Sequence, residues 1–263
     1  MNSSRILLVD DMELNLVILN ELLREGNFNT RTACNGEEAV QLSRKIKFDL
    51  ILMDIQMPLL NGLEATCQIR SEKTNPNNRT PIIALSANVS ETDRVAYLAA
   101  GMNAVLKKPF DIAVFFQLLS TFLDEPMPEQ PANALPAQIQ EASCTVSIDL
   151  DNLLRIGKNN RGFVGMMLRS FRDSASEILG DMEQALAKKE WEVTAQLLHK
   201  LKFALHVMGA GNLDEEVKWI ETHANNPQPE NEEEMQVRIR AFIAVIRELY
   251  QQAGLLIESG EWC

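Results

Sequence analysis

The sequence predicts an α/β unit with a parallel sheet, followed by an all-α helical bundle. In the first half, short apolar runs alternate with stretches that place apolar residues at helical spacing. Four prolines then cluster, at Pro126, Pro128, Pro131 and Pro136. In the second half, apolar residues recur at helical spacing without any strand pattern. These three observations predict two domains of different fold class, joined by a stiff, exposed linker.

The predicted strands are short apolar runs at 6–9, 49–53, 81–85 and 104–106. The helices between them are identified by apolar residues at helical spacing, at 13–24, 37–44 and 91–100. Solid apolar runs are typical of strands that are covered on both faces. Repeated strand–helix units therefore predict a parallel sheet with helices on both of its faces.

The second half contains four predicted helices, at 161–187, 191–208, 213–224 and 232–258. Short turns between such helices favour antiparallel packing in a bundle. The predicted domains are 1–124 and 147–263, and the proline-rich linker is 125–146.

Charge and hydropathy exclude several classes of function. The chain has 25 basic and 37 acidic residues, which gives a formal net charge of −12. This charge argues against binding nucleic acid over a broad surface. The longest nearly apolar stretch, 112–123, is too short to span a bilayer. The first residues lack the apolar core of a signal peptide, so we expect a cytoplasmic location without membrane insertion.

Polar residues follow the predicted strands. Asp10 and Asp11 follow the first strand, Asp54 and Ser86 follow two others, and Lys108 follows the last. The carboxyl ends of parallel strands meet at one edge of a sheet, where ligands bind. Clustered carboxylates repel one another unless a cation lies among them, and hard oxygen ligands suit Mg²⁺. Together with a lysine and a serine, they suit an aspartate that becomes phosphorylated.

The strings LLVDDMELN, LILMDIQMP, ALSAN and LKKPF resemble the successive signatures of the response-regulator receiver domain, over about residues 4–123. The resemblance implies a doubly wound, five-stranded parallel sheet of the flavodoxin-like type. It also implies that Asp54 is the phosphoacceptor and that Ser86 and Lys108 bind the phosphoryl group. For Mg²⁺ it implies the ligands Asp10 (through water), Asp11, Asp54 and the backbone carbonyl of Gln56.

The first half departs from the receiver pattern at one position. The family usually carries Tyr or Phe where this chain has Val105. That aromatic residue couples phosphorylation to the outer surface of the domain, so we expect a different structural response in this chain.

On a helical wheel, the stretch 191–208 has one apolar stripe, which consists of Leu198, Leu201, Ala204, Leu205 and Met208. His199, Phe203 and His206 lie on the opposite side. The wheel therefore predicts that these three side chains face away from the core. An exposed imidazole is what a phosphoryl acceptor requires, although a plain solvent-facing histidine satisfies the same geometry.

The string that begins at His199 resembles the histidine phosphotransfer (HPt) motif, over about residues 145–258. The resemblance implies that His199 is a phosphoacceptor, with Lys202 and Gly209 as accessory residues. Phe203 stands where the family has glycine, next to His199 on the helix. An exposed Phe203 would either anchor a docking receiver or block the histidine.

We therefore predict a phosphorelay signalling protein that uses Mg²⁺ and whose partners are sensor histidine kinases or other receiver domains. No nucleotide-binding pattern such as G-x-x-x-x-G-K-[ST] is present, so no kinase activity of its own is assigned. The alternative is a receiver joined to a degenerate bundle, in which Phe203 binds a receiver and His199 accepts no phosphoryl group. The sequence leaves open whether the chain is the tail of a longer hybrid kinase.

Overall fold

The structure is a computed structural model that describes residues 3–24, 26–86, 89–108, 110, 112–123, 146–157, 159–224, 228 and 231–262. The chain divides into two compact units, residues 1–139 and 140–263. The proline cluster of the predicted linker lies outside the described residues. The domain boundaries expected from the sequence thus stay predictions.

The first unit is built on a five-stranded parallel sheet, as predicted, with the strand order β2-β1-β3-β4-β5. The strands are β1 (Arg5–Val9), β2 (Asn29–Ala33), β3 (Leu50–Asp54), β4 (Ile82–Ser86) and β5 (Ala104–Lys107). Every residue of β3 and β4 is buried. These two strands lie inside the sheet with both faces covered, which explains why they consist almost entirely of apolar residues.

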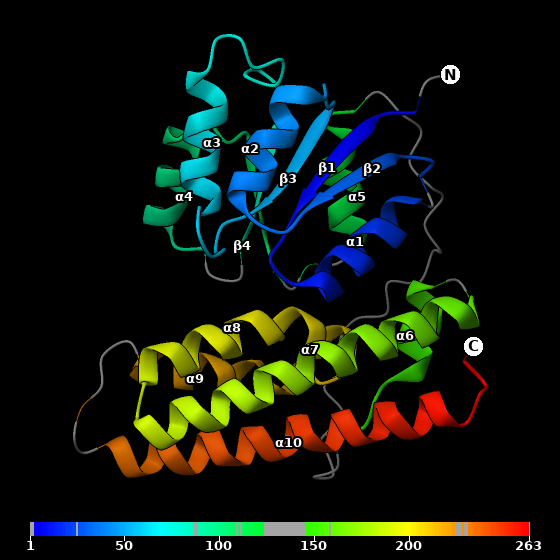
Figure 1. Cartoon of the computed structure of the whole chain (residues 1–263), viewed down its shortest axis with the longest axis vertical. Coiled ribbons are helices and arrows are strands. Elements are labelled where there is room, and N and C mark those ends of the chain that lie inside the picture. Colours follow the sequence, from blue (N-terminus) through cyan, green and yellow to red (C-terminus); the bar gives the residue numbers. More distant parts are fainter. Residues whose placement is uncertain are drawn as a thin grey trace. The chain divides into compact units, whose positions relative to one another are not determined.

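Five helices flank this sheet: α1 (Glu13–Arg24), α2 (Gly36–Lys45), α3 (Gly62–Ser71), α4 (Glu91–Ala99) and α5 (Ile112–Ser120). Figure 1 shows α2, α3 and α4 on one side of the sheet, and α1 and α5 on the other. Side-chain caps start α2, α3 and α4, at Asn35, Asn61 and Ser90. Such caps satisfy the first backbone N–H groups of a helix, so each helix has a defined start beside the sheet edge.

Three elements of this unit, β2, α3 and α5, were not predicted from the apolar pattern. β2 consists mostly of polar residues, and only one of its five residues is buried, because it lies at the edge of the sheet and pairs with β1 alone. The helix α3 also has only a weak apolar pattern, with Ala65, Thr66 and Ile69 buried beside Gly62. The other four strands and the helices α1, α2 and α4 confirm the predicted positions within two residues at each end.

The second unit is all-α, which confirms the predicted fold class. Its helices are α6 (Leu150–Ile156), α7 (Arg161–Lys188), α8 (Trp191–Val207), α9 (Asp214–Ala224) and α10 (Glu232–Glu258), with a 3-10 turn at Gly211–Leu213. The helix α7 packs against α8 and α10, and α8 packs against α9. At the end of α7, Lys189 adopts a left-handed conformation (φ 57°), which stops the helix and lets α8 begin two residues later.

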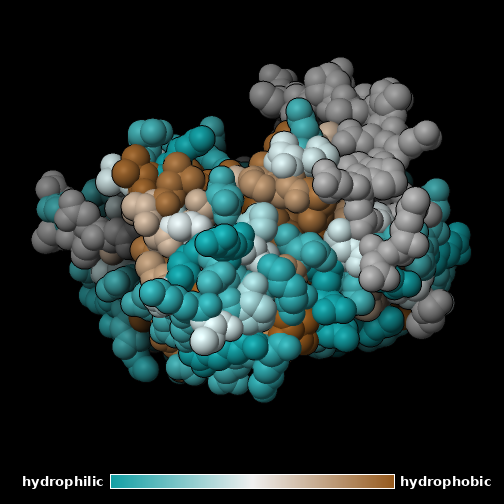
Figure 2. Space-filling view, turned by 90° about the horizontal axis from the view of Figure 1, so that it is seen from above, coloured by the Kyte–Doolittle hydropathy of each residue, from teal (hydrophilic) through white to brown (hydrophobic). Residues whose placement is uncertain are grey.

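The surface shown in Figure 2 is mostly hydrophilic, with separate hydrophobic patches. The exposed large apolar residues of the first unit include Val95 and Leu98 on α4 and Val114 on α5. In the described part of the chain, no helix combines the length and the apolarity that crossing a membrane requires.

Candidate functional site

Three carboxylates meet at the carboxyl edge of the sheet. Asp10 and Asp11 follow β1, and Asp54 ends β3, the strand that pairs with β1. One carboxylate oxygen of each residue lies within 4.8 Å of the corresponding atoms of the other two. Asp10 is fully buried and Asp54 is 8% exposed. The expected meeting of these side chains at one sheet edge is therefore confirmed, and hard oxygen ligands so close together fit a divalent cation such as Mg²⁺.

The ammonium group of Lys108 lies among these carboxylates. Its Nζ donates to Asp10 Oδ2 at 2.6 Å and to Asp54 Oδ2 at 3.0 Å. The lysine is 4% exposed, so both ion pairs are screened little by water. One positive charge against three carboxylates leaves an excess of two negative charges when all are ionised. A divalent cation would neutralise that excess.

The surroundings change the protonation of two of these groups. Burial raises the pKa of Asp54 to about 7, Lys108 opposes that rise, and Asp10 and Asp11 add to it. Burial lowers the pKa of Lys108, but Asp10 and Asp54 outweigh this and hold it above its usual value. Lys108 therefore stays charged, whereas Asp54 without a further cation titrates near neutral pH.

Asp10 is held in place from α1. Its Oδ1 accepts hydrogen bonds from the backbone N–H of Met12 at 3.0 Å and from Asn15 Nδ2 at 2.9 Å, while its Oδ2 contacts Lys108. Asn15, which is 3% exposed, was not predicted as part of the site. In the sequence, only its place in the predicted helix 13–24, five residues after Asp10, marks this residue. Asn15 thus orients the carboxylate at the centre of the cluster.

The remaining predicted residues lie around Asp54. The backbone N–H of Gln56 donates to Asp54 Oδ1 at 3.3 Å, so this segment turns back over the carboxylate. At Gly62, a Cβ atom would lie 2.0 Å from the carbonyl oxygen of Asp54, so any side chain there would displace the loop after β3. Ser86 ends β4 beside Asp54 and is 5% exposed. Ala87, Asn88 and Pro109 of the matched motifs lie outside the described residues.

His199 lies on α8 and contacts a carboxylate that the sequence did not single out. Its Nδ1 lies 2.9 Å from Oε1 of Glu221 on α9. The two side chains are 17% and 16% exposed, so the imidazole is half-buried rather than fully exposed as expected. Glu221 stands 22 positions after His199 on another helix, so no local spacing marks it as a partner.

The prediction for Phe203 was wrong. The five residues of the predicted apolar stripe are buried, but Phe203 is also buried, at 5% exposure. The helical wheel assumed that only one face of this helix is buried. That assumption fails because α8 packs against both α7 and α9, so more than one of its faces is covered. Phe203 is therefore a core residue, and the arguments that treated it as an exposed anchor or block do not hold.

The two other predicted accessory residues differ in their surroundings. Lys202 is half-buried, one helical turn after His199. Gly209 has φ +95° after the end of α8, and a Cβ atom there would lie 2.4 Å from Cβ of Asp149. Asp149 caps the start of α6, and its backbone N–H donates to the carbonyl of Met208. Gly209 therefore allows α6 to pack directly against the end of α8.

Comparison with known proteins identifies both units. Residues 6–120 match the model of the response regulator receiver domain, and residues 166–253 match that of the Hpt domain. The sensor protein GacS of Pseudomonas syringae pv. syringae is 27% identical over 244 residues, which cover 91% of this chain and 26% of that protein. Hybrid signal transduction histidine kinase I of Dictyostelium discoideum is 33% identical over 122 residues, which cover 44% of this chain and 7% of that protein.

Among solved structures, the receiver domain of the sensor histidine kinase PA1611 from Pseudomonas aeruginosa PAO1, with a magnesium ion coordinated in its active site cleft, is 36% identical. The match covers 46% of this chain and 98% of that chain, with a TM-score of 0.43. The chain spans between 7% and 28% of the length of the first curated relatives that it matches. It carries a response-regulator receiver domain at residues 6–120, followed by an Hpt domain at residues 166–253, the two kinds of domain that act in two-component phosphorelay signalling.

Proposed function

We propose that this chain is a phosphorelay intermediate. Asp54 accepts a phosphoryl group from the phosphohistidine of a partner in a Mg²⁺-dependent reaction, and His199 exchanges a phosphoryl group with a receiver aspartate. The observation that carries the proposal is the position of Asp54, whose oxygen lies 3.0 Å from a buried lysine within a cluster of three carboxylates. Asp10, Asp11, Asp54 and the carbonyl of Gln56 would hold the cation.

At Asp54, the ionised carboxylate is the nucleophile. One of its oxygens attacks the phosphorus atom of a phosphohistidine, an O–P bond forms, and the P–N bond breaks with its electron pair returning to the imidazole nitrogen. Lys108 already contacts Oδ2, so its ammonium group is placed to pair with the negative phosphoryl oxygens. Bound Mg²⁺ supplies positive charge that favours the ionised carboxylate and stabilises these oxygens.

At His199, the contact with Glu221 selects the tautomer. An ionised carboxylate only accepts hydrogen bonds, so the imidazole Nδ1 at 2.9 Å carries the proton that it donates. The Nε2 atom then presents its lone pair to the phosphorus of a phosphoaspartate. The N–P bond forms as the O–P bond breaks, and the carboxylate of the donor is regenerated. Lys202, one turn along α8, offers positive charge to the transferred group.

The partners that this chemistry requires are a phosphohistidine donor and a second receiver. Sensor histidine kinases and receiver domains of other proteins fit these roles, and the matched relatives include a sensor protein and a hybrid histidine kinase. Such relatives support the proposal that this chain works as part of, or beside, a hybrid kinase. The non-transferring alternative loses its argument because Phe203 is buried. A cytoplasmic location stays a prediction from the sequence.

Phosphorylation of the full chain tests the proposal. With Mg²⁺ and acetyl phosphate or phosphoramidate, we expect a hydroxylamine-sensitive phosphoryl group on Asp54, because an acyl phosphate reacts with this nucleophile. We expect an acid-labile group on His199, because the phosphoramidate bond is cleaved in acid. Intact-mass measurement and peptide mapping report both sites. Asp54→Asn removes the first label and His199→Ala removes the second.

His206→Ala is the matched control for the histidine, because His206 lies on the same helix and is exposed. This variant keeps both labels. Replacing Mg²⁺ with EDTA removes the Asp54 label only. A chain that takes no label at either residue from any donor, including a phosphorylated sensor kinase, contradicts the proposed function.

Glu221→Ala is expected to slow phosphorylation of His199 by about tenfold, which corresponds to about 1.4 kcal/mol of lost transition-state stabilisation. The reason is that, without the carboxylate, the imidazole also populates the tautomer whose Nε2 carries the proton and has no lone pair to attack with. Nitrogen-15 NMR of the imidazole measures the tautomer ratio, and single-turnover transfer from a phosphorylated receiver measures the rate. Glu215→Ala changes an exposed carboxylate on the same helix and leaves both unchanged. An unaltered tautomer ratio in Glu221→Ala would exclude this role.

A further inference from the structure

The side chain of Asn15 has a buried oxygen atom that makes no hydrogen bond. Asn15 lies on α1 and is 3% exposed, and its Oδ1 has no hydrogen-bond partner in the described part of the chain. The other six buried residues of α1 are apolar. A buried acceptor without a donor costs free energy, so such an atom is a candidate partner for a donor that a bound molecule supplies.

The hydrogen bond to Asp10 decides which end of this amide faces the carboxylate. Asn15 Nδ2 lies 2.9 Å from Asp10 Oδ1. Asp10 also pairs with the ammonium group of Lys108, so its carboxylate is ionised and only accepts hydrogen bonds. The amide nitrogen, and not the oxygen, must therefore face Asp10. The free oxygen belongs to the same planar amide, so it lies close to the Asp10 carboxylate without receiving a proton from it.

The carboxylate of Asp10 has room for one further donor. It is fully buried, and its oxygens accept three hydrogen bonds, from the backbone N–H of Met12, from Asn15 Nδ2 and from Lys108 Nζ. A carboxylate offers about four acceptor positions. A water molecule has two protons to donate. A single water can therefore fill the remaining position of Asp10 and also donate to the free oxygen of Asn15.

We propose that Asn15 is a positioning residue of the cation site. Its Nδ2 holds the Asp10 carboxylate in the orientation that contacts Lys108. Its Oδ1 accepts a hydrogen bond from a water molecule of bound Mg²⁺, and Asp10 accepts the second proton of that water. Mg²⁺ keeps several of its waters in protein sites, and residues behind the metal ligands orient the groups that bind it. This inference rests on the proposed use of Mg²⁺ by the receiver domain.

Nitrogen-15 NMR of the full chain observes the Asn15 amide directly. Its side-chain NH₂ signal is assigned through the resonances of its own backbone. Because a hydrogen bond to the oxygen of an amide changes the chemical shift of its NH₂ group, we expect this signal to move when MgCl₂ is added at constant ionic strength. The control is Asn20 on the same helix, whose Oδ1 already accepts from the hydroxyl of Thr30. The Asn20 signal stays in place.

Asn15→Leu removes both the donor and the acceptor and keeps a side chain of similar size. We expect the dissociation constant for Mg²⁺, measured from backbone amide shifts in the same titration, to rise about tenfold, the lower end of the loss when a residue behind a metal ligand is removed. Asn20→Leu is the matched control, and its affinity for Mg²⁺ is unchanged.

Urea unfolding in EDTA separates positioning from a merely structural role. Asn15→Leu loses one hydrogen bond to Asp10, but it also replaces an unpaired buried oxygen with apolar groups, so we expect little change in the unfolding midpoint of the receiver domain without Mg²⁺. With MgCl₂, the unsubstituted chain gains more stability than the variant, because it binds the cation more tightly. A variant that loses equal stability in EDTA and in MgCl₂ would show that Asn15 has a structural role only.

The outcomes distinguish this inference from the proposed function. Intact mass after reaction with acetyl phosphate and Mg²⁺ reports whether Asp54 is phosphorylated. If Asp54 carries the phosphoryl group, then an Asn15 signal that stays in place at saturating Mg²⁺, or an unchanged dissociation constant in Asn15→Leu, overturns the inference and leaves the proposed function standing. A chain that binds no Mg²⁺ and takes no phosphoryl group on Asp54 contradicts both.

Discussion

Lys108→Met is expected to destabilise the receiver domain by about 3–5 kcal/mol at pH 8 in the absence of divalent cations, because it leaves buried carboxylates without their counter-charge. Lys108 is 4% exposed and contacts both Asp10 and Asp54, so little water reaches the charges that remain. Methionine has a similar length and packs in the same space, so the loss comes from charge rather than from a cavity. Added Mg²⁺ restores much of the stability.

The stability lost in Lys108→Met is expected to be larger at high pH than at low pH. The pKa of Asp54 is about 7 in the folded protein, far above its unfolded value, and removal of the Lys108 charge raises it further. The folded state therefore holds a proton that the unfolded state releases, and stability falls as pH rises from the unfolded pKa through the folded one. At pH 5, Asp54 is protonated in the folded variant, so the loss is smaller than at pH 8.

Urea unfolding of the full chain measures these differences domain by domain. All three tryptophans, Trp191, Trp219 and Trp262, lie in the second unit, residues 140–263, so their fluorescence follows that unit alone. Far-UV circular dichroism also includes the receiver domain, whose transition shifts by roughly 2 M urea for a loss of this size. Lys107→Met is the matched control, because Lys107 is the exposed neighbour. Equal receiver midpoints for the two variants at pH 8 would show that the buried charge does not destabilise the domain.

The strand ends could be predicted from the sequence for a simple physical reason. Parallel strands present their carboxyl ends at one edge, so residues that follow separate apolar runs must meet there. This placed Asp10, Asp11, Asp54 and Lys108 together without any knowledge of their distances. By contrast, β2 at 29–33 was not found, because an edge strand paired on one side needs no continuous apolar run.

The contacts of the site residues could not be predicted, because they join side chains from different helices or strands. Glu221 reaches His199 from α9, 22 positions along the chain. No helix or strand imposes such a spacing. The error at Phe203 has the same origin, because a wheel assigns one buried face to a helix, whereas the neighbours of α8 cover more of it.

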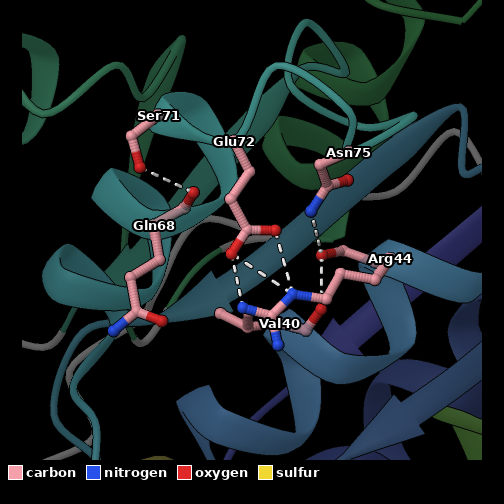
Figure 3. Close-up of polar contacts among 7 residues, drawn as sticks. Val40, Arg44, Gln68, Ser71, Glu72 and Asn75 are labelled. Carbon is pink, nitrogen blue, oxygen red and sulfur yellow. Dashed lines mark hydrogen bonds and ion pairs between the residues drawn. The ribbon is translucent and has the colours of Figure 1, made fainter.

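A second group of polar residues, buried at Ser43, Asn75 and Asn77 but exposed at Arg44, joins elements at the opposite end of the sheet, near the start of β3. Figure 3 shows Arg44 on α2 paired with Glu72, which follows α3, and Asn75 beside them; Arg44 Nε donates to Glu72 Oε2 at 2.9 Å. Asn75 Nδ2 donates to the hydroxyl of Ser43 at 2.9 Å, and both residues are buried. The loop between α3 and β4 is therefore joined to the end of α2 by side chains rather than by backbone pairing.

Asn77 is the centre of this group. It is fully buried, and its side-chain amide donates at 2.6 Å to each of the carbonyls of Ser43 and Ile46, at the end of α2. Its Oδ1 accepts from the backbone N–H of Phe48 at 2.8 Å and from the Thr80 hydroxyl at 2.9 Å. These four hydrogen bonds use the full capacity of an amide side chain. They also satisfy carbonyls that the end of a helix leaves without intrahelical partners.

Asn77→Ala is expected to destabilise the receiver domain by about 3–4 kcal/mol, because buried backbone groups that lose their partners each cost about 1–3 kcal/mol, only partly offset by relaxation. Asn77→Asp is expected to be at least as destabilising, since a carboxylate has no proton to donate to the carbonyls of Ser43 and Ile46. The same urea titration measures the loss, with tryptophan fluorescence of the second unit unchanged. The control is Asn78→Ala, because the side chain of Asn78 makes one long hydrogen bond, 3.3 Å to the carbonyl of Lys73, and its loss costs less than about 1 kcal/mol. If the two alanine variants unfold at the same urea concentration, the buried amide is not what holds this loop to α2.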